Sequence, residues 1–404
     1  MTYDLLPPLV IEWLNLLVRW IHVLAAIMWI GDSFLFMWMD SSLSAPAKPR
    51  AGAVAGEMWM VHSGGFYEVV KRRFLAPDEM PPALYWFKWQ AYSTWITGFL
   101  LLAIVYYLGG GTYLVDPVLS KLGHGAAIIV SLAMMAAAWL LYDALWMSPL
   151  GRNARLATAL SLLLVALAAW GSTAVFAGRA AYLQFGAIVG TVMAANVWRR
   201  IIPSQDQMLA ATRAGTPVDT SLGLRAKSRS IHNHYMTLPV LFTMLSNHSP
   251  ATYGHAQNAV VLLLIVVVGM ALKYVMNFGR RSNRWIVAAG VGALAAAITM
   301  TVRTTAPTAD PALAREPVVE WAEVQTILEQ RCLTCHTAKP THPAFPQPPS
   351  GIILEDPRRV RELAARILVR VVHTETMPLG NLTAMTPEER VRIGAWIAQG
   401  ARIP

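Results

Sequence analysis

Eight long apolar segments dominate the first three hundred residues of this chain and restrict it to a membrane-spanning fold. Each can cross the roughly 30 Å hydrocarbon core of a bilayer, which takes about 20 helical residues. Because hydrocarbon offers backbone amides no partners, such segments must be helices that pack together. The predicted spans cover residues 15–38, 90–108, 123–146, 156–176, 181–201, 233–249, 257–277 and 285–304.

Lysine and arginine are distributed unevenly between the loops, and this predicts an orientation. The loops after the first, third, fifth and seventh spans are rich in basic residues, whereas the alternate loops hold only Lys121 and Arg179. Basic loops stay in the cytoplasm, so we expect both ends of the bundle to face outward. The basic loop residues are Lys48, Arg50, Lys71, Arg72, Arg73, Lys88, Arg152, Arg155, Arg199, Arg200, Arg213, Arg225, Lys227, Arg229, Arg280, Arg281 and Arg284.

These loops also account for the net charge of +10, since from Ala306 onward eleven basic residues are balanced by eleven acidic ones. A nucleic-acid partner is therefore not needed to explain the basic balance. The expected surroundings are the lipids of a bacterial inner membrane.

Cys332-Leu-Thr-Cys335-His336 is the pattern of c-type haem attachment, in which two thiols bond the haem vinyl groups and the histidine ligates the iron. The chain has no other cysteine, which excludes a disulfide framework and a four-cysteine zinc site. A thioredoxin-like redox pair would need a βαβ context, and this segment is predicted to be helical with proline-rich loops. We therefore predict one covalent haem c, with His336 as an axial ligand.

The sixth iron ligand is expected downstream of this motif. Met377 is favoured because Pro378 restrains its loop, and His373 is the bis-histidine alternative. Met385 is expected to pack in the core instead. Because c-type cytochromes mature outside the cytoplasmic membrane, the motif requires a periplasmic C-terminus, in agreement with the loop charges.

Helix signals flank the motif and predict a small all-α cytochrome c domain. Asp356 and Thr386 are N-cap residues, each followed by proline, and Thr386 with Glu389 forms a capping box. In the last helix Val391, Trp396 and Ile397 fall near one face and are expected to cover the haem or the core. The fold prediction is all-α, with a transmembrane domain at 1–304, a linker at 305–316 and the cytochrome domain at 317–404.

Polar residues within the spans indicate where chemistry could take place, because each is costly in hydrocarbon. The simplest interpretation is that they cap helix ends, but two groups share a depth. The outer group is Arg19, His22, His124 and His248. The inner group is His62, Asn196, His232 and Asn233. The segment around His62 is expected to form an interfacial helix that borders a pocket.

Several runs resemble the bacterial membrane-bound urate oxidases, or urate hydroxylases, that are fused to a cytochrome c. These runs are Leu14–Gly31, Trp59–Tyr67, Phe87–Tyr92, Ser230–Pro239 and Ser246–His248, together with the terminal C-x-x-C-H domain. The resemblance covers nearly the whole chain. It departs at His234, where Asn is expected.

The resemblance implies oxidation of urate to 5-hydroxyisourate, with electrons passed to the haem and then to a soluble cytochrome c or a terminal oxidase, without release of peroxide. A planar purine anion requires arginine or histidine donors and a base that titrates near neutral pH. The expected catalytic residues are Arg19, His22, His62 and His232. A pocket in the inner half would need a relay, for which a b haem on His22 with His124 or His248 is one hypothesis. A membrane cytochrome oxidising quinol or another donor is the alternative function.

Overall fold

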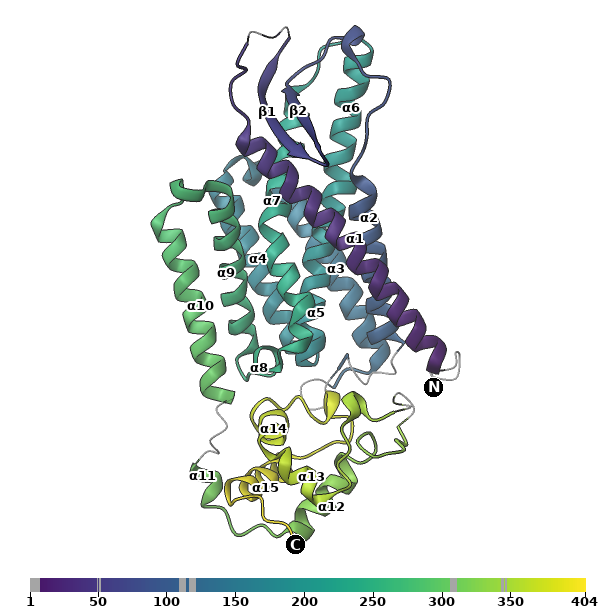
Figure 1. Cartoon of the computed structure of the whole chain (residues 1–404), viewed down its shortest axis with the longest axis vertical. Coiled ribbons are helices and arrows are strands. Elements are labelled where there is room, and N and C mark those ends of the chain that lie inside the picture. The colour runs from purple at the N-terminus through teal and green to yellow at the C-terminus, as the bar shows by residue number, and fades with distance from the viewer. Residues whose placement is uncertain are drawn as a thin grey trace.

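The computed structural model describes residues 8–48, 50, 52–108, 114–115, 121–305, 311–342, 345 and 347–404. A long helical bundle and a small helical domain at one end of it make up the molecule (Figure 1). The start of α1 (Pro8–Ser42) lies at the same end of the bundle as the small domain. An even number of membrane crossings brings the start of α1 and the small domain to the same side.

Every predicted span coincides with a helix. The remaining bundle helices are α2 (Lys88–Leu102), α3 (His124–Met147), α4 (Ala154–Val175), α5 (Gly178–Asn196), α6 (Ile202–Arg213), α7 (Thr220–Leu245), α8 (Pro250–Tyr253), α9 (Asn258–Phe278) and α10 (Arg284–Thr305). In the described part of the chain six helices are long and apolar enough to cross a membrane: α1, α3, α4, α5 with its continuation into α6, α9 and α10. For α2, which is short, and α7, which begins well before residue 233 and is more polar, crossing remains a prediction.

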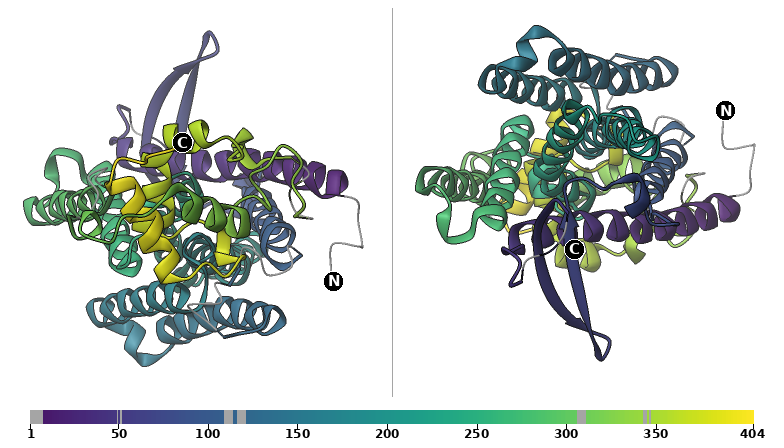
Figure 2. Two further views of the ribbon diagram at one scale, coloured as in Figure 1. Left: turned by 90° about the horizontal axis from the view of Figure 1, so that it is seen from below. Right: turned by 90° about the horizontal axis from the view of Figure 1, so that it is seen from above.

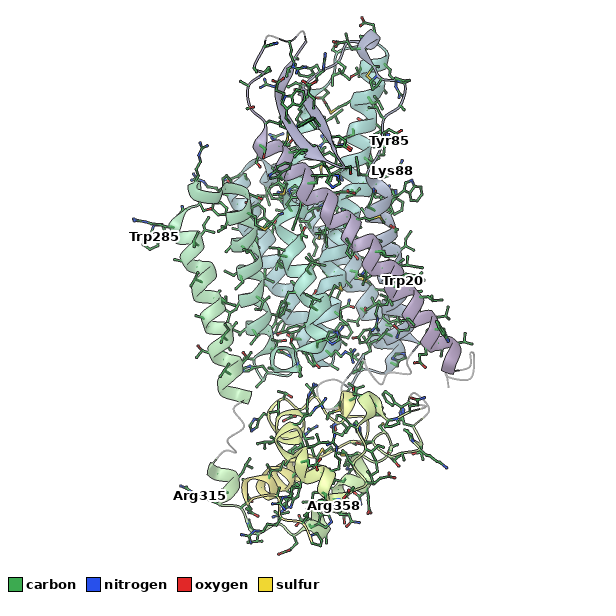
Figure 3. All side chains as sticks on the ribbon, viewed as in Figure 1. Trp20, Tyr85, Lys88, Trp285, Arg315 and Arg358 are labelled. Atoms are coloured by element: carbon green, nitrogen blue, oxygen red, sulfur yellow. The ribbon has the colours of Figure 1, made fainter. Side chains whose placement is uncertain are left out.

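Helix α5 forms the centre of the bundle. Most of its residues are buried, and it packs against α3, α4 and α7. Viewed along the bundle axis, the α3–α4 and α9–α10 pairs lie at the margins (Figure 2). Trp20 on α1 and Trp285 on α10 point outward (Figure 3), as residues of an interfacial aromatic belt do.

The segment after α1 is a β-hairpin, so the expected interfacial helix is wrong and the fold is mostly helical instead of all-α. Strand β1 (Val54–His62) pairs antiparallel with β2 (Gly65–Arg72), and His62 lies opposite Gly65. The two connecting residues, Ser63 and Gly64, have φ of 51° and 74°. A two-residue hairpin loop requires positive φ at both positions, and glycine meets this need without strain.

The small domain contains α11 (Pro311–Ala314), α12 (Trp321–Arg331), α13 (Pro357–Glu362), α14 (Ala364–Ile367) and α15 (Pro387–Ala398). The predicted N-cap at Asp356 and the capping box of Thr386 are confirmed. Trp396 and Met385 lie in the core, 1% and 2% exposed. Val391 is 37% exposed, so its predicted burial is wrong: it points away from the face that carries Trp396.

The close approach of α5 and α7 at Gly186 gives a stability prediction. A β-carbon added at Gly186 would lie 2.3 Å from Oγ1 of Thr243, whereas one added at Gly190 would meet nothing within 4 Å. We expect Gly186→Ala to destabilise the protein by about 1–3 kcal/mol, the usual cost of overpacking. Thermal unfolding in detergent measures this effect. Gly190→Ala, one turn away, is the control, and equal melting temperatures for the two variants would contradict the packing.

Candidate functional site

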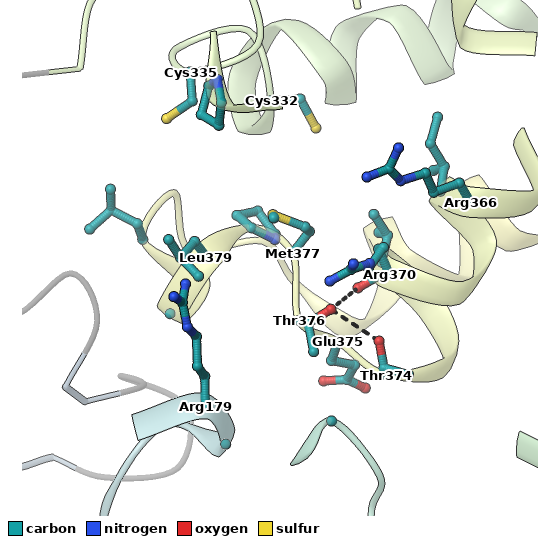
Figure 4. A pocket seen from close by; sticks show the side chains of 18 of the residues that line it. Arg179, Cys332, Cys335, Arg366, Arg370, Thr374, Glu375, Thr376, Met377 and Leu379 are labelled. Carbon is teal, nitrogen blue, oxygen red and sulfur yellow. Dashed lines mark hydrogen bonds between the residues drawn. The ribbon is translucent and has the colours of Figure 1, made fainter. Parts of the chain in front are cut away.

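The Cys332–His336 turn presents its thiols and imidazole to one cavity. Cys332 is the C-cap of α12, and its carbonyl accepts hydrogen bonds from the backbone N–H groups of Cys335, at 3.2 Å, and His336, at 2.9 Å. All three residues line a cavity of about 840 Å³. Figure 4 shows both thiols at one end of this cavity. The turn therefore brings together the groups that the sequence motif predicts to act together.

His336 is held as an iron ligand would need to be. Its Nδ1 lies 3.0 Å from the carbonyl oxygen of Ile352, which leaves Nε2 for coordination. The N–H of Leu354 donates to the His336 carbonyl and fixes the same segment. Burial lowers the pKa of His336, so the imidazole is neutral near pH 7, the form that binds a metal.

Met377 lines the same cavity from the opposite loop. The Met377 N–H donates to the carbonyl of Arg370, and Arg390 Nη1 donates to the Met377 carbonyl at 2.7 Å. Arg390 is only 6% exposed and also donates to the carbonyl of Val371. The alternative ligand, His373, lines the cavity as well.

The other wall of the cavity comes from the outer end of the bundle. Its lining residues include Arg179, Asn247, His248, Tyr253, Gly254 and His255. The two bodies touch tightly here, because a β-carbon added at Gly254 would lie 2.6 Å from Cγ2 of Thr376. Of this wall only His248 was among the predicted site residues. From the sequence, Arg179 was noted only as one of the few basic residues in the outer loops.

The residues of this cavity match the requirements of a covalently attached haem. Two thiols, an imidazole and a thioether converge on it, and apolar side chains of Leu328, Ile367, Val371 and Ile393 line it. Arg366 and Arg370 also point into it (Figure 4), where they can pair with haem propionates. The predicted ligands therefore fit the group.

The outer pair Arg19 and His22 have different hydrogen-bond partners. Arg19 is exposed and donates to Oδ1 of Asn15, one turn away on the same helix. His22 points between α1 and α2, with Nδ1 3.0 Å from the Thr94 carbonyl oxygen and 3.1 Å from Thr97 Oγ1. This contact with α2 agrees with the simplest interpretation, in which the histidine provides a hydrogen-bond partner for a helix backbone group.

Most of the predicted inner group does come together, but without His62. His62 is exposed at the hairpin turn, where its Nδ1 contacts Ser63 Oγ at 2.7 Å. His232 Nδ1 lies 2.6 Å from the hydroxyl oxygen of Tyr142. Asn196 Nδ2 donates to Oδ1 of Asn233 at 2.9 Å and to the Tyr142 hydroxyl.

Beside this inner group lies an ion-pair cluster that the sequence did not reveal. Asp143 accepts from Arg229 at 3.1 Å and is paired with Arg200 through both carboxylate oxygens. The Arg229 guanidinium also lies 4.9 Å from the ring centroid of Tyr142, and the Trp146 ring lies 4.2 Å from that of His232. Three helices, α3, α5 with its π-helical continuation, and α7, are joined at this level.

A comparison with known protein families bears on the bundle. The family described as urate oxidase N-terminal matches residues 8–303. The chain belongs to this urate oxidase family. No curated protein and no solved structure matches the chain.

The matched range contains the hairpin and the bundle up to the last turn of α10, and it ends before the C-x-x-C-H motif. Membership therefore indicates urate oxidation and attaches it to the membrane part. The small C-terminal domain and the electron acceptor lie outside this match.

The histidines suggested for a b haem have different surroundings in this urate oxidase family member. His22 contacts Thr94 and Thr97, His124 Nε2 lies 2.7 Å from the Tyr107 carbonyl oxygen, and His248 lines the cavity beside Cys332. A b haem on His22 with His124 or His248 stays a prediction.

The ligand prediction for the cavity can be tested with Met377→His. Because thioether ligation raises the potential of a haem, the imidazole should lower the midpoint potential and remove the charge-transfer band of methionine-ligated ferric haem. Potentiometric titration and absorption spectroscopy measure these effects. Met385→Leu changes a buried methionine outside the cavity lining and is the control. An unchanged potential and spectrum in Met377→His would contradict Met377 as the ligand.

Proposed function

We propose that this chain is a membrane urate hydroxylase that converts urate to 5-hydroxyisourate and passes the electrons to its own c-type haem. The observation that carries this proposal is the shared cavity. Its one wall belongs to the range matched by the urate oxidase family, and its other wall holds Cys332, Cys335, His336 and Met377.

The reaction balances with water as the oxygen source: urate and water give 5-hydroxyisourate, two protons and two electrons. The water oxygen forms the new bond to C5 of the purine. When bound, a c-type haem supplies a one-electron acceptor at the outer end of the bundle. The electrons then leave to a soluble cytochrome c or a terminal oxidase, and no peroxide forms.

The residues of the small domain hold that acceptor in place. Cys332 and Cys335 supply the covalent attachment, and the bond from His336 to the Ile352 carbonyl orients the imidazole. Arg390 donates to the carbonyls of Val371 and Met377 and so fixes the backbone that leads to Met377. Such a rigid ligand set keeps the acceptor against the bundle between turnovers.

The proposed location is a bacterial inner membrane, with the small domain in the periplasm. The six long apolar helices support a multi-pass membrane protein. The basic loops and the maturation of c-type cytochromes outside the cytoplasm both favour a periplasmic C-terminus. Downstream acceptors of the periplasm and the membrane can then reach the haem.

The proposal predicts that urate reduces the haem in anaerobic membranes, seen as the rise of its reduced absorption bands. Oxygen-18 from labelled water should enter the product, and a peroxide assay should stay negative in air. A Cys332→Ser/Cys335→Ser variant, which cannot attach haem, is the control and should lose urate turnover. Absence of haem reduction by urate, with rapid reduction by quinol, would favour the quinol-oxidising alternative.

A further inference from the structure

We infer that the urate anion binds in the bundle-side part of the haem cavity, against Arg179, Asn247 and His248. This inference rests on the proposed function and adds the position of the substrate. The three residues lie in the family-matched range and line the cavity. None of them is among the residues expected to bind urate in the inner half of the membrane.

Arg179 supplies the positive charge. It lies in the first turn of α5, and its side chain points from the bundle into the cavity (Figure 4). Its Nε donates to Oδ1 of Asn247 at 3.0 Å, which fixes the direction of the guanidinium. Among the described residues no carboxylate lies within ion-pair distance of it. A planar guanidinium held in this way suits a planar anion with adjacent oxygen and nitrogen acceptors.

Asn247 and His248 supply the complementary groups. They belong to the short Ser246–His248 turn after α7, the segment with the Ser-Asn-His motif. The Asn247 amide can donate to a purine carbonyl, because its oxygen is already taken by Arg179. His248 is exposed and can accept a proton from water or from a purine N–H as the C5–O bond forms.

The wall behind these residues is rigid. Tyr182 donates from its hydroxyl to the carbonyls of Thr252 and Asn258 at 3.2 and 2.8 Å. Its ring lies 6.4 Å from that of Tyr253, which is 6% exposed and lines the cavity. A β-carbon added at Gly178 would lie 2.3 Å from the Tyr253 carbonyl oxygen, so α5 begins directly against this turn. Arg179 therefore has a fixed base from which to hold a ligand.

Two other arginine groups serve different partners. Arg366 and Arg370 come from the small domain and suit the propionates of the haem that the same domain attaches. Arg229, in the inner half, already pairs with Asp143. Helix α3 rises by about 27 Å between His124 and Tyr142, at 1.5 Å per residue. Urate bound at Arg229 would thus be separated from the cavity by most of the bundle, whereas urate at Arg179 shares the cavity with the acceptor.

The experiment compares Arg179→Gln and Asn247→Leu with the wild-type holoprotein in detergent. Calorimetric titration with urate under anaerobic conditions measures affinity, and redox titration measures the haem potential. We expect the dissociation constant to rise at least about tenfold in each variant, the loss typical of a hydrogen bond to a charged group. The haem content, absorption spectrum and midpoint potential should stay those of the wild type.

Arg200→Gln is the matched control, because this arginine shares Asp143 with Arg229 and lies outside the cavity. Its urate affinity should equal that of the wild type. A shifted haem potential with unchanged urate affinity in Arg179→Gln would make Arg179 a propionate partner and overturn the inference. Loss of urate binding in Arg229→Gln alone would move the site to the inner half. If wild-type protein with intact haem neither binds urate nor is reduced by it, the proposed function itself fails.

Discussion

The absence of hydrogen-bond partners in hydrocarbon is the constraint on which the rest of this structure depends. It forces the membrane-spanning segments into helices and favours positions for polar side chains between helices or at an end of the bundle. His22 contacts α2, Asn196 contacts Asn233, and Asp143 pairs with two arginines of other elements. The same constraint leaves the ends of the bundle as the places where polar groups can face a cavity.

The two polar regions of the bundle therefore have different physical characters. In the inner half, Asp143, Arg200 and Arg229 compensate one another, and Tyr142 with His232 extends the network between three helices. Removing one member would leave a buried charge without its partner and destabilise the fold, so stability alone accounts for this cluster. At the outer end Arg179 has an amide for a partner instead of a carboxylate, and its charge remains available to an anion.

The sequence was informative where local rules decide the structure. Apolar length located the helices of the bundle, and N-cap chemistry located α13 and α15. The C-x-x-C-H spacing located the turn at Cys332, because three residues close in sequence must share one side of a turn. The hairpin was missed because its aromatic and other apolar residues also suit one face of an interfacial amphipathic helix. Arg179 was missed as a site residue because its role depends on Asn247, far away along the chain, and on a wall contributed by another domain.

Placing oxidation chemistry at the junction of the two bodies follows from the stepwise nature of the reaction. Urate gives up two electrons, and a single haem accepts one at a time, so the substrate must stay beside the acceptor through two transfers. A soluble carrier would have to dissociate and be replaced between them. In the proposed reaction the acceptor is part of the chain, and the contact of Gly254 with Thr376 holds its domain on the bundle. Such a junction would keep the acceptor beside the one-electron-oxidised purine until the second electron is transferred.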